Sequence, residues 1–155
     1  MTPVKPIRSL LPWLPWDFTY CEPCAGTLRM AKVLGMPKEA YDIKIRTPLV
    51  RKLDALELEE KHVQGCDFII TNPPWTREIL HPLIERFAQL RPTWLLFDAD
   101  WAYTKQANPY LRYCSTIVAV GRVSWMENGT SGLDNAAWYR FDDAATATRF
   151  HGIAA

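Results

Sequence analysis

The chain has 155 residues, a net charge of +1, and ordinary shares of apolar (48%) and charged (23%) residues. Its length predicts a single domain over residues 1–155 without a separate target-recognition domain, and its charge balance provides no global cationic field for tight, non-specific binding to duplex nucleic acid. No apolar stretch approaches the roughly 18 residues that span a bilayer and no signal peptide is evident, so we expect no membrane partner and a cytoplasmic location.

Short elements separated by prolines and glycines are predicted in the first part of the chain. The proline-rich start contains a short helical stretch around residues 7–14. The elements that follow are a strand over residues 17–21, a helix over residues 26–34 that ends at Gly35, a strand within residues 39–45, and a turn or short helix around residues 54–56. A strand, a glycine-containing turn and a helix in this order predict the first part of a β-α-β unit.

Longer apolar runs dominate the second part of the chain. They predict strands over residues 66–71, 93–98 and 114–120, and a helical period predicts an amphipathic helix over residues 78–90. Residues 122–125 and 136–141 flank a loop rich in Gly, Asn and Ser, as the two strands of a hairpin do. Because strands alternating with helices imply parallel pairing, we predict an α/β fold: a Rossmann-like, mostly parallel sheet flanked by helices, with an antiparallel C-terminal hairpin.

Four cysteines are present: Cys21, Cys24, Cys66 and Cys114. The first two form a C-x-x-C pair, which is found in zinc sites and redox sites. A tetrahedral zinc site normally needs a second closely spaced pair, and the other two cysteines lie far apart in the sequence. We therefore expect no metal and interpret the cysteines as small buried side chains in a reducing cytosol.

Asn72-Pro73-Pro74-Trp75 directly follows the strand predicted over residues 66–71. Proline fixes φ and lacks a backbone donor, so neither a strand nor a helix continues through the pair. The amide of Asn72 and the ring of Trp75 are therefore expected at the carboxyl end of a strand, where open α/β sheets bind ligands. An amide beside an aromatic ring suits a planar base that carries an exocyclic amine. The other interpretation is a strand that simply ends at a proline turn.

Three upstream features are placed to form a ligand crevice beside this tetrapeptide. Glu22-Pro23-Cys24-Ala25-Gly26 lies between a strand and a helix, where small residues let a ligand approach backbone amides. Asp42 comes sixteen residues after Gly26, near the end of the next strand, in a place suited to ribose hydroxyls. Asp54, followed by Ala55, is a candidate partner for an adenine amine. Each acid alone is as typical of a turn as of a binding site.

Taken together, these residues resemble the class I S-adenosyl-L-methionine-dependent methyltransferases, specifically the amino-methyltransferases that act on adenine N6 or cytosine N4 in DNA. The resemblance covers most of the chain. The tetrapeptide at residues 72–75 matches the catalytic motif, which is the most specific signature of the family. Residues 22–26 are similar to its cofactor loop, Asp42-Ile43 to its ribose-binding acid, and Asp54-Ala55 to its adenine-binding acid. Thr2-Pro3 looks like a segment that precedes the catalytic core in many members, and residues 121–125 and 137–141 match the late hairpin of small phage-type members more weakly.

This resemblance implies the cofactor S-adenosyl-L-methionine and no metal. The implied catalytic residues are Asn72, Pro73, Pro74 and Trp75. The implied cofactor-binding residues are Glu22, Pro23, Cys24, Ala25, Gly26, Asp42, Ile43, Asp54, Ala55 and Asn72. The implied target is an exocyclic amine of a nucleic-acid base, with adenine N6 in DNA first, in a phage or bacterial enzyme. Without a recognition domain, specificity is expected from loops, a homo-oligomer or a recognition partner.

Alternatives remain open at this point: methylation of an RNA base, methylation of a protein glutamine, and a non-catalytic module of the same fold that acts with a partner. The chain also departs from the family pattern at one place. Where the family usually has a second glycine, two residues after Gly26, this chain has Leu28. We expect a side chain there to crowd the methionine part of the cofactor and to weaken its binding.

Overall fold

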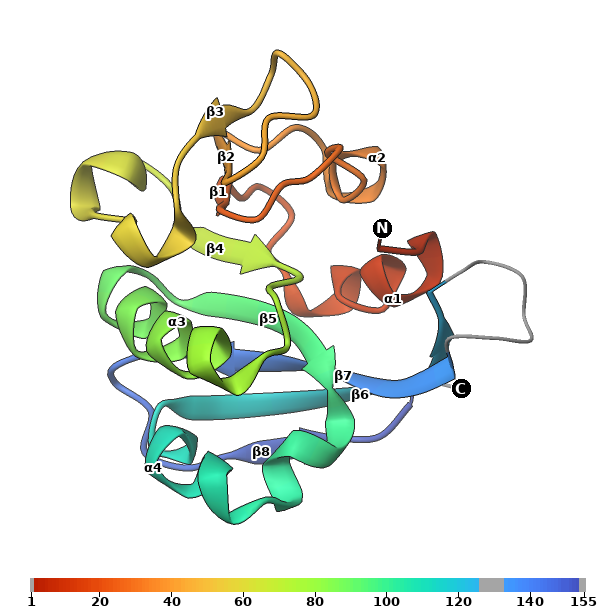
Figure 1. Ribbon diagram of the computed structural model, residues 1–155. Coiled ribbons are helices and arrows are strands. Elements are labelled where there is room, and N and C mark those ends of the chain that lie inside the picture. Colours follow the sequence, from red (N-terminus) through yellow and green to blue (C-terminus); the bar gives the residue numbers. More distant parts are fainter. Residues whose placement is uncertain (1, 126–132, 154–155) are drawn as a thin grey trace.

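Eight strands form one mixed sheet in the computed structural model, which describes residues 2–125 and 133–153 (Figure 1). They lie side by side in the order β3-β2-β1-β4-β5-β7-β6-β8. Their bounds are β1 Tyr20–Glu22, β2 Glu39–Asp42, β3 Arg51–Lys52, β4 Phe68–Thr71, β5 Thr93–Asp98, β6 Cys114–Ser124, β7 Leu133–Phe141 and β8 Arg149–His151. The predicted α/β class, with a mostly parallel, Rossmann-like sheet and an antiparallel end, is confirmed.

The five strands from β3 to β5 are all parallel. The chain runs outward from β1 to β2 and β3, and it then returns to β4 on the other side of β1. The carboxyl ends of β1 and β4 therefore meet where the strand order reverses. In open α/β sheets this switch point is where ligands bind, so the topology alone locates the candidate site.

The antiparallel end of the sheet is formed by β7, which pairs with both β5 and β6. Residues 114–120 and 122–125, predicted as two strands, belong to the single strand β6, except for Trp125, which directly follows its end. A register shift between Ala119 and Gly121 interrupts its pairing, and Gly121 adopts a positive φ of 82°, as bulge positions often require. The predicted hairpin is confirmed by the β6–β7 pairing, while its loop, residues 126–132, lies outside the described residues.

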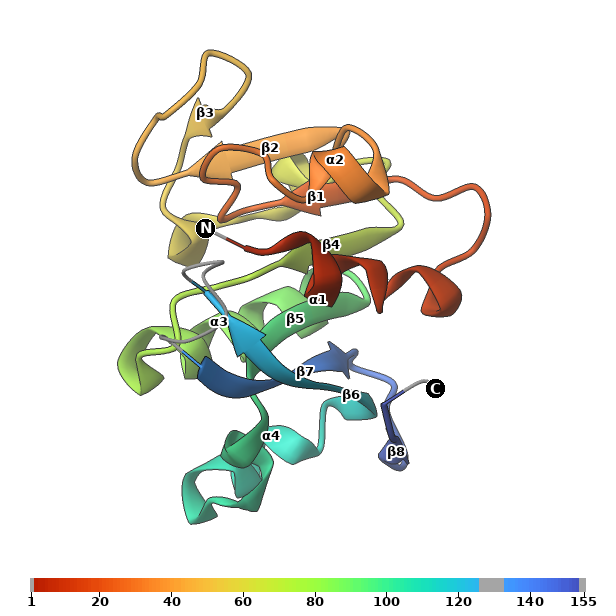
Figure 2. The same ribbon diagram turned by 90° about the vertical axis from the view of Figure 1, so that its right-hand side faces the viewer.

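Helices cover both faces of the sheet (Figures 1 and 2). The α-helices are α1 Val4–Arg8, α2 Ala31–Leu34, α3 Arg77–Leu90 and α4 Asn108–Leu111. The 3-10 helices are Leu11–Trp13, Ala55–Glu57, Glu60–His62, Ala99–Tyr103 and Lys105–Ala107. The prediction for α3 is confirmed, whereas the helix predicted over residues 7–14 is divided between α1 and the first 3-10 helix. None of the helices in the described part of the chain is long and apolar enough to span a membrane.

The helix predicted over residues 26–34 is wrong for its first half. Residues 26–30 form turns, and only Ala31–Leu34 is helical. Gly26 and Leu28 both have positive φ, at 53° and 58°. An α-helix needs negative φ at every residue, so these two positions delay the helix start and leave an irregular loop after β1.

Alternating side chains of the central strands supply two separate cores. Leu95 and Phe97 of β5 belong to the core that α3 covers, while Trp94 and Leu96 belong to the core that contains Ile7 near the N-terminus. This alternation follows from the two-residue period of a strand. Because both faces of β5 are buried, the carboxyl edge of the sheet is held between two packed layers.

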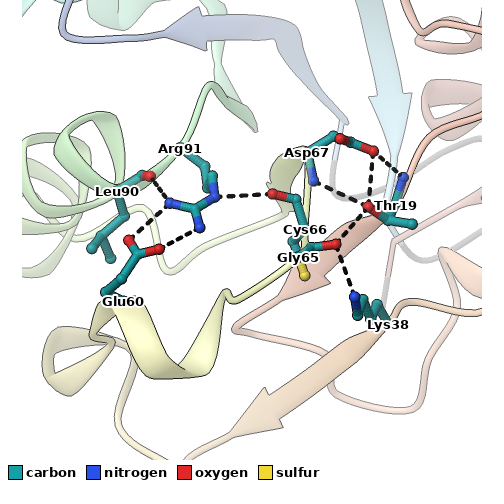
Figure 3. A network of polar contacts seen from close by, with 8 residues as sticks. All are labelled: Thr19, Lys38, Glu60, Gly65, Cys66, Asp67, Leu90 and Arg91. Atoms are coloured by element: carbon teal, nitrogen blue, oxygen red, sulfur yellow. Dashed lines mark hydrogen bonds and ion pairs between the residues drawn. The ribbon is translucent and has the colours of Figure 1, made fainter.

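A polar network fixes the opposite edge of β1 and β4 (Figure 3). The backbone nitrogen and Oγ1 of Thr19 each donate to Oδ2 of Asp67 at 2.8 Å, and the Asp67 nitrogen donates back to Thr19 Oγ1 at 3.1 Å. Arg91, just after α3, donates from Nε to the carbonyl of Cys66 at 2.9 Å and pairs with the Glu60 carboxylate. These bonds set how β1 and β4 begin, and hence where both strands end at the ligand edge.

Candidate functional site

A cleft of about 610 Å³ opens at the carboxyl ends of β1 and β4. Its lining comes from four separate segments: Thr2, Glu22, Cys24, Ala25, Gly26, Thr27, Arg29, Asp42, Arg46, Asn72, Pro73 and Pro74. A smaller, mainly apolar cleft of about 210 Å³ is lined by Pro23, Cys24, Asp42, Ile43, Asp54, Ala55, Leu56, Pro74, Ile79 and Leu83. The two clefts share Cys24, Asp42 and Pro74, so they form one crevice. All of the predicted site residues except Trp75 line one cleft or the other.

The loop after β1 is tied to the end of β2 by two backbone donors. The Ala25 nitrogen donates to the Tyr41 carbonyl at 2.9 Å, and the Gly26 nitrogen donates to Asp42 Oδ2 at 2.8 Å. The second oxygen of Asp42 accepts from the Lys44 nitrogen at 2.8 Å. The carboxylate is therefore held rigidly at the edge of both clefts, and each oxygen keeps a further lone pair for a ligand hydroxyl.

The side chain of Leu28 lies away from the cleft that it was expected to crowd. Its side chain is only 7% exposed and packs with Ala25, Ala40 and Val50 in a small apolar cluster. It lines neither cleft in the described structure. The backbone adopts the left-handed conformation that a glycine would take, and the side chain is placed in the protein interior rather than over the ligand. The expected crowding of the cleft is therefore absent from this arrangement.

Glu22 is a buried carboxylate at the end of β1. It is 2% exposed, lines the larger cleft, and its Oε2 has no hydrogen-bond partner in the described structure. Burial, and then the nearby Asp42 carboxylate, raises the pKa of the Glu22 carboxyl well above its ordinary value. A buried acceptor without a donor is costly, and a cationic or N–H group in the cleft would satisfy it.

The smaller cleft has an apolar wall and an acidic end. Asp54 caps the 3-10 helix that follows it, because its Oδ1 accepts from the Leu56 nitrogen at 2.9 Å. Ile43, 58% exposed, and Ile79, 36% exposed, present aliphatic surface at the same cleft. A flat apolar ring with an amine at its edge fits this combination of walls and carboxylate.

The tetrapeptide leaves β4 at the floor of the larger cleft. Asn72 is half-buried; its Oδ1 accepts from Nε1 of Trp75 at 3.1 Å, and its Nδ2 donates to Oγ1 of Thr2 at 3.1 Å. Pro73 and Pro74 also line the cleft. Trp75 packs instead edge-to-face against Trp125 of the β6–β7 hairpin, with ring centroids 5.2 Å apart.

Cys24 is the one cysteine that lines the clefts, and its thiol is poorly suited to act as a nucleophile. Burial raises the pKa of its thiol to about 12, with a further contribution from the Asp42 carboxylate, so the thiolate is scarce at neutral pH. The four cysteines are all free; the prediction that they are buried holds for Cys21, Cys66 and Cys114, whereas Cys24 is only partly buried. Across residues 2–125 and 133–153, no group of three or more His, Cys, Asp or Glu side chains is arranged to hold a metal ion.

Sequence reasoning missed several residues of the larger cleft. Thr27 and Arg29 directly follow the predicted loop, so their proximity to Gly26 was a usable signal. Arg46 comes from the connection between β2 and β3, and Thr2 from the N-terminus. Neither of those two has a local pattern that assigns it to the site, apart from the Thr-Pro resemblance noted for Thr2.

Comparison with known proteins identifies the fold. No family model and no curated protein matches the sequence. Among solved structures, a methyltransferase from Thermotoga maritima described as S-adenosylmethionine-dependent superposes with a TM-score of 0.61 at 12% identity, covering 89% of this chain and 87% of that one. The M protein of the type I restriction enzyme EcoKI superposes with a TM-score of 0.55 at 11% identity, covering 91% of this chain and 44% of that one. A chain of a type I restriction-modification complex superposes with a TM-score of 0.61 at 14% identity, covering 100% of this chain and 45% of that one. The chain thus has the fold of S-adenosylmethionine-dependent methyltransferases and spans less than half the length of the two restriction-system proteins.

Proposed function

We propose that this protein transfers a methyl group from S-adenosyl-L-methionine to an exocyclic amine of a nucleic-acid base, with adenine N6 in DNA as the first candidate. The observation that supports this most strongly is the convergence of Asn72 with the Gly26 loop and Asp42 in one crevice at the strand-order switch. The fold is shared with methyltransferases, and the tetrapeptide at the end of β4 supplies the acceptor chemistry.

The residues of the crevice suit the cofactor. The unpartnered Oε2 of Glu22 fits the ammonium group of its methionine part, and the Arg46 guanidinium fits the carboxylate. Asp42 is positioned for ribose hydroxyls, and the smaller cleft with Asp54 for the adenine ring and its amine. When bound, the cofactor supplies an electrophilic methyl group on a sulfonium. Cys24 remains a neutral thiol and shapes the wall between the two clefts.

Asn72 would raise the reactivity of the target amine. The lone pair of an aromatic amine is delocalised into its ring, which makes it a poor nucleophile. Hydrogen bonds accepted from the NH₂ group by Asn72 Oδ1 and the Pro73 carbonyl draw the nitrogen toward tetrahedral geometry and localise the lone pair. The rigid Pro73-Pro74 backbone fixes these acceptors, so the reacting atoms are held in one geometry and the displacement becomes effectively intramolecular.

A flipped-out base is the substrate geometry that this chemistry requires. A base inside a duplex cannot reach a cleft of this kind, so the target must be extruded or single-stranded. The Trp75 ring, which Trp125 holds in place, would stack on the extruded base and offset part of the stacking that it loses. A further solved structure with this fold, at TM-score 0.55 and 16% identity, is a dimethyladenosine transferase from Plasmodium falciparum, which is consistent with an adenine acceptor.

Target specificity is part of the same proposal. Residues 1–155 would act as one catalytic domain and would take sequence recognition from loops, a second copy or a partner. Type I restriction-modification neighbours, one solved as part of a complex assembly, support an arrangement in which a methyltransferase domain works inside a larger assembly.

The test combines binding with transfer. Calorimetric titration of S-adenosyl-L-methionine into the protein should give a one-to-one complex. Transfer of a tritiated methyl group should then be measured on duplex DNA, single-stranded DNA, RNA and a glutamine-containing peptide. We expect label in adenine of DNA, and loss of at least about 100-fold of the rate in Asn72→Ala, as when one transition-state hydrogen bond is removed.

An exposed asparagine in α4 supplies the control, because Asn108→Ala should leave transfer unchanged. Label in RNA or peptide alone would reassign the substrate. A protein that neither binds the cofactor nor transfers label in any arm would overturn the proposal and favour a non-catalytic module.

A further inference from the structure

Two hydrogen bonds hold the side chain of Asn72, and one of the two partners is packed against a third segment of the chain. The two partners are Thr2, from the N-terminus, and Trp75, from the segment between β4 and α3; Trp75 packs against Trp125, which directly follows β6. The Asn72 amide lies between the first two, with 3.1 Å from Trp75 Nε1 to Asn72 Oδ1 and 3.1 Å from Asn72 Nδ2 to Thr2 Oγ1. Both ends of the amide are therefore occupied by protein groups.

These two partners specify which way the amide faces. The indole N–H of Trp75 can only donate, so the atom opposite it must be the amide oxygen. The hydroxyl of Thr2 can accept, and it takes a hydrogen bond from the amide nitrogen. A flipped Asn72 would set its NH₂ group against the indole N–H, and both groups would then lose a partner in a half-buried place.

The two partners are themselves held by the core. Trp125 packs edge-to-face on the Trp75 ring, an arrangement that aromatic quadrupoles favour. Thr2 precedes a segment in which Ile7 is fully buried and the Pro6 carbonyl accepts from Nε1 of the buried Trp138 at 2.7 Å. The amide is thus connected on one side to the hairpin and on the other to the N-terminal helix.

We propose that Thr2 and Trp75 are positioning residues that hold the Asn72 amide with its oxygen available to the target amine. The inference rests on the proposed function, because the orientation matters only if Asn72 accepts a hydrogen bond from an NH₂ group. The oxygen has two lone pairs, so one serves Trp75 and the other remains for the substrate. A flipped Asn72 amide would present its NH₂ group to the NH₂ group of the target base. It could accept no hydrogen bond from that amine and could not activate it. Tryptophan at position 75 thereby has a second role that phenylalanine, which also has an aromatic face, cannot fill.

Isosteric variants separate this role from simple packing. Thr2→Val replaces the hydroxyl by a methyl group, and Trp75→Phe keeps an aromatic ring without an N–H group. Each should lower kcat for methyl transfer about three- to tenfold, the range expected for one net hydrogen bond, and leave the KM for the cofactor unchanged. Thr2→Ser keeps the acceptor and should restore the wild-type rate. Because both bonds act on one amide, the double variant should lose less than the product of the two single effects.

Matched controls are available on the same chain. Thr146 is exposed in the connection between β7 and β8, at the opposite edge of the sheet, and Trp16 is fully exposed. Thr146→Val and Trp16→Phe make the same chemical changes away from the cleft and should leave kcat unchanged. Equal losses in a control and its test variant would overturn the proposal, as would failure of Thr2→Ser to restore the rate.

A readout without substrate distinguishes this inference from the proposed function. The indole resonance of Trp75, assigned by its absence in Trp75→Phe, should be protected from hydrogen exchange in the wild type. Asn72→Ala should increase its exchange at least about tenfold. An unchanged indole exchange rate in Asn72→Ala would overturn the positioning role even in an active enzyme. Normal protection in a protein that transfers no methyl group would instead overturn the proposed function and leave the contact intact.

Discussion

At the scale of single residues, the Glu22 side chain at the end of β1 has an oxygen that no group in the described structure satisfies. The Glu22 carboxyl is buried, with an unpartnered oxygen and a pKa raised first by burial and then by Asp42. In the unfolded chain the same carboxyl ionises near its ordinary value, so the native state binds the proton more tightly. Stability should therefore fall as pH rises from the unfolded pKa, about 4.3, toward the higher folded pKa.

Replacing the Glu22 carboxyl group should raise the stability of the free protein and weaken cofactor binding. Glu22→Gln removes the ionisable group, so without cofactor it should be more stable than the wild type at neutral pH, and the difference should shrink as pH falls toward about 4. Its affinity for S-adenosyl-L-methionine should drop about tenfold, since a charge-assisted hydrogen bond is lost. Urea unfolding across pH and calorimetric titration measure the two effects. Parallel pH profiles for the two proteins would contradict the assignment of a buried, unsatisfied carboxylate.

Leu28 sets two local energies against each other. A left-handed backbone costs a leucine roughly 1–2 kcal/mol, while burying its side chain contributes roughly 1.5–3 kcal/mol. Leu28→Gly relieves the first and loses the second, and it adds backbone freedom to the unfolded chain. We expect a net loss of about 1 kcal/mol in the free energy of unfolding, measured in urea, with cofactor affinity unchanged. Clearly tighter cofactor binding by the variant would show that the side chain does crowd the cleft.

At the scale of elements, the helices and strands that have a long apolar pattern could be predicted from the sequence. The helix α3 and the strands β4 and β5 have long apolar patterns, and all three are found where they were expected. The strands β3 and β8 have two and three residues, too few for any pattern to emerge. The early helix failed for another reason: its apolar spacing was helical, but the positive φ at Leu28 belongs to a tertiary arrangement in which the side chain is buried beside β2.

The candidate site shows the same division. Residues next to a strand end, such as Asp42 and Asn72, could be assigned from sequence because topology brings strand ends together. The contact between Thr2 and Asn72 joins positions 70 residues apart, and nothing local to either position indicates it. Trp75 was expected to present its ring to a base, whereas its indole N–H bond to Asn72 appeared only with the geometry. Side-chain orientation depends on packing, which a linear pattern does not encode.

At the scale of the whole molecule, a net charge of +1 conceals an uneven distribution. Residues 27–52 contain seven Lys or Arg and two Asp or Glu, whereas the rest of the chain has eleven basic and fifteen acidic residues. This stretch forms α2, β2 and β3, which lie together at one end of the molecule (Figure 1). Its Arg29 and Arg46 reach the cleft. A polyanion bound at the crevice would therefore meet its most favourable field at this end.

Under the proposed function, this charge distribution predicts how the affinity for nucleic acid should depend on salt. Lys44 and Lys52 are exposed on this end, and each phosphate contact contributes about 0.9 to the slope of log affinity against log salt for duplex DNA. Lys44→Gln with Lys52→Gln should reduce that slope by about one to two, as measured by fluorescence anisotropy with labelled DNA between about 50 and 200 mM salt. Lys105→Gln with Arg149→Gln removes the same charge from exposed positions outside this stretch, in a 3-10 helix and in β8, and should change the slope by less than about 0.5. Equal slopes for the two double variants would mean that the nucleic acid does not lie along the cationic end. Because a net charge of +1 gives no general attraction, a difference between these matched pairs reports where the polyanion lies rather than how charged the protein is.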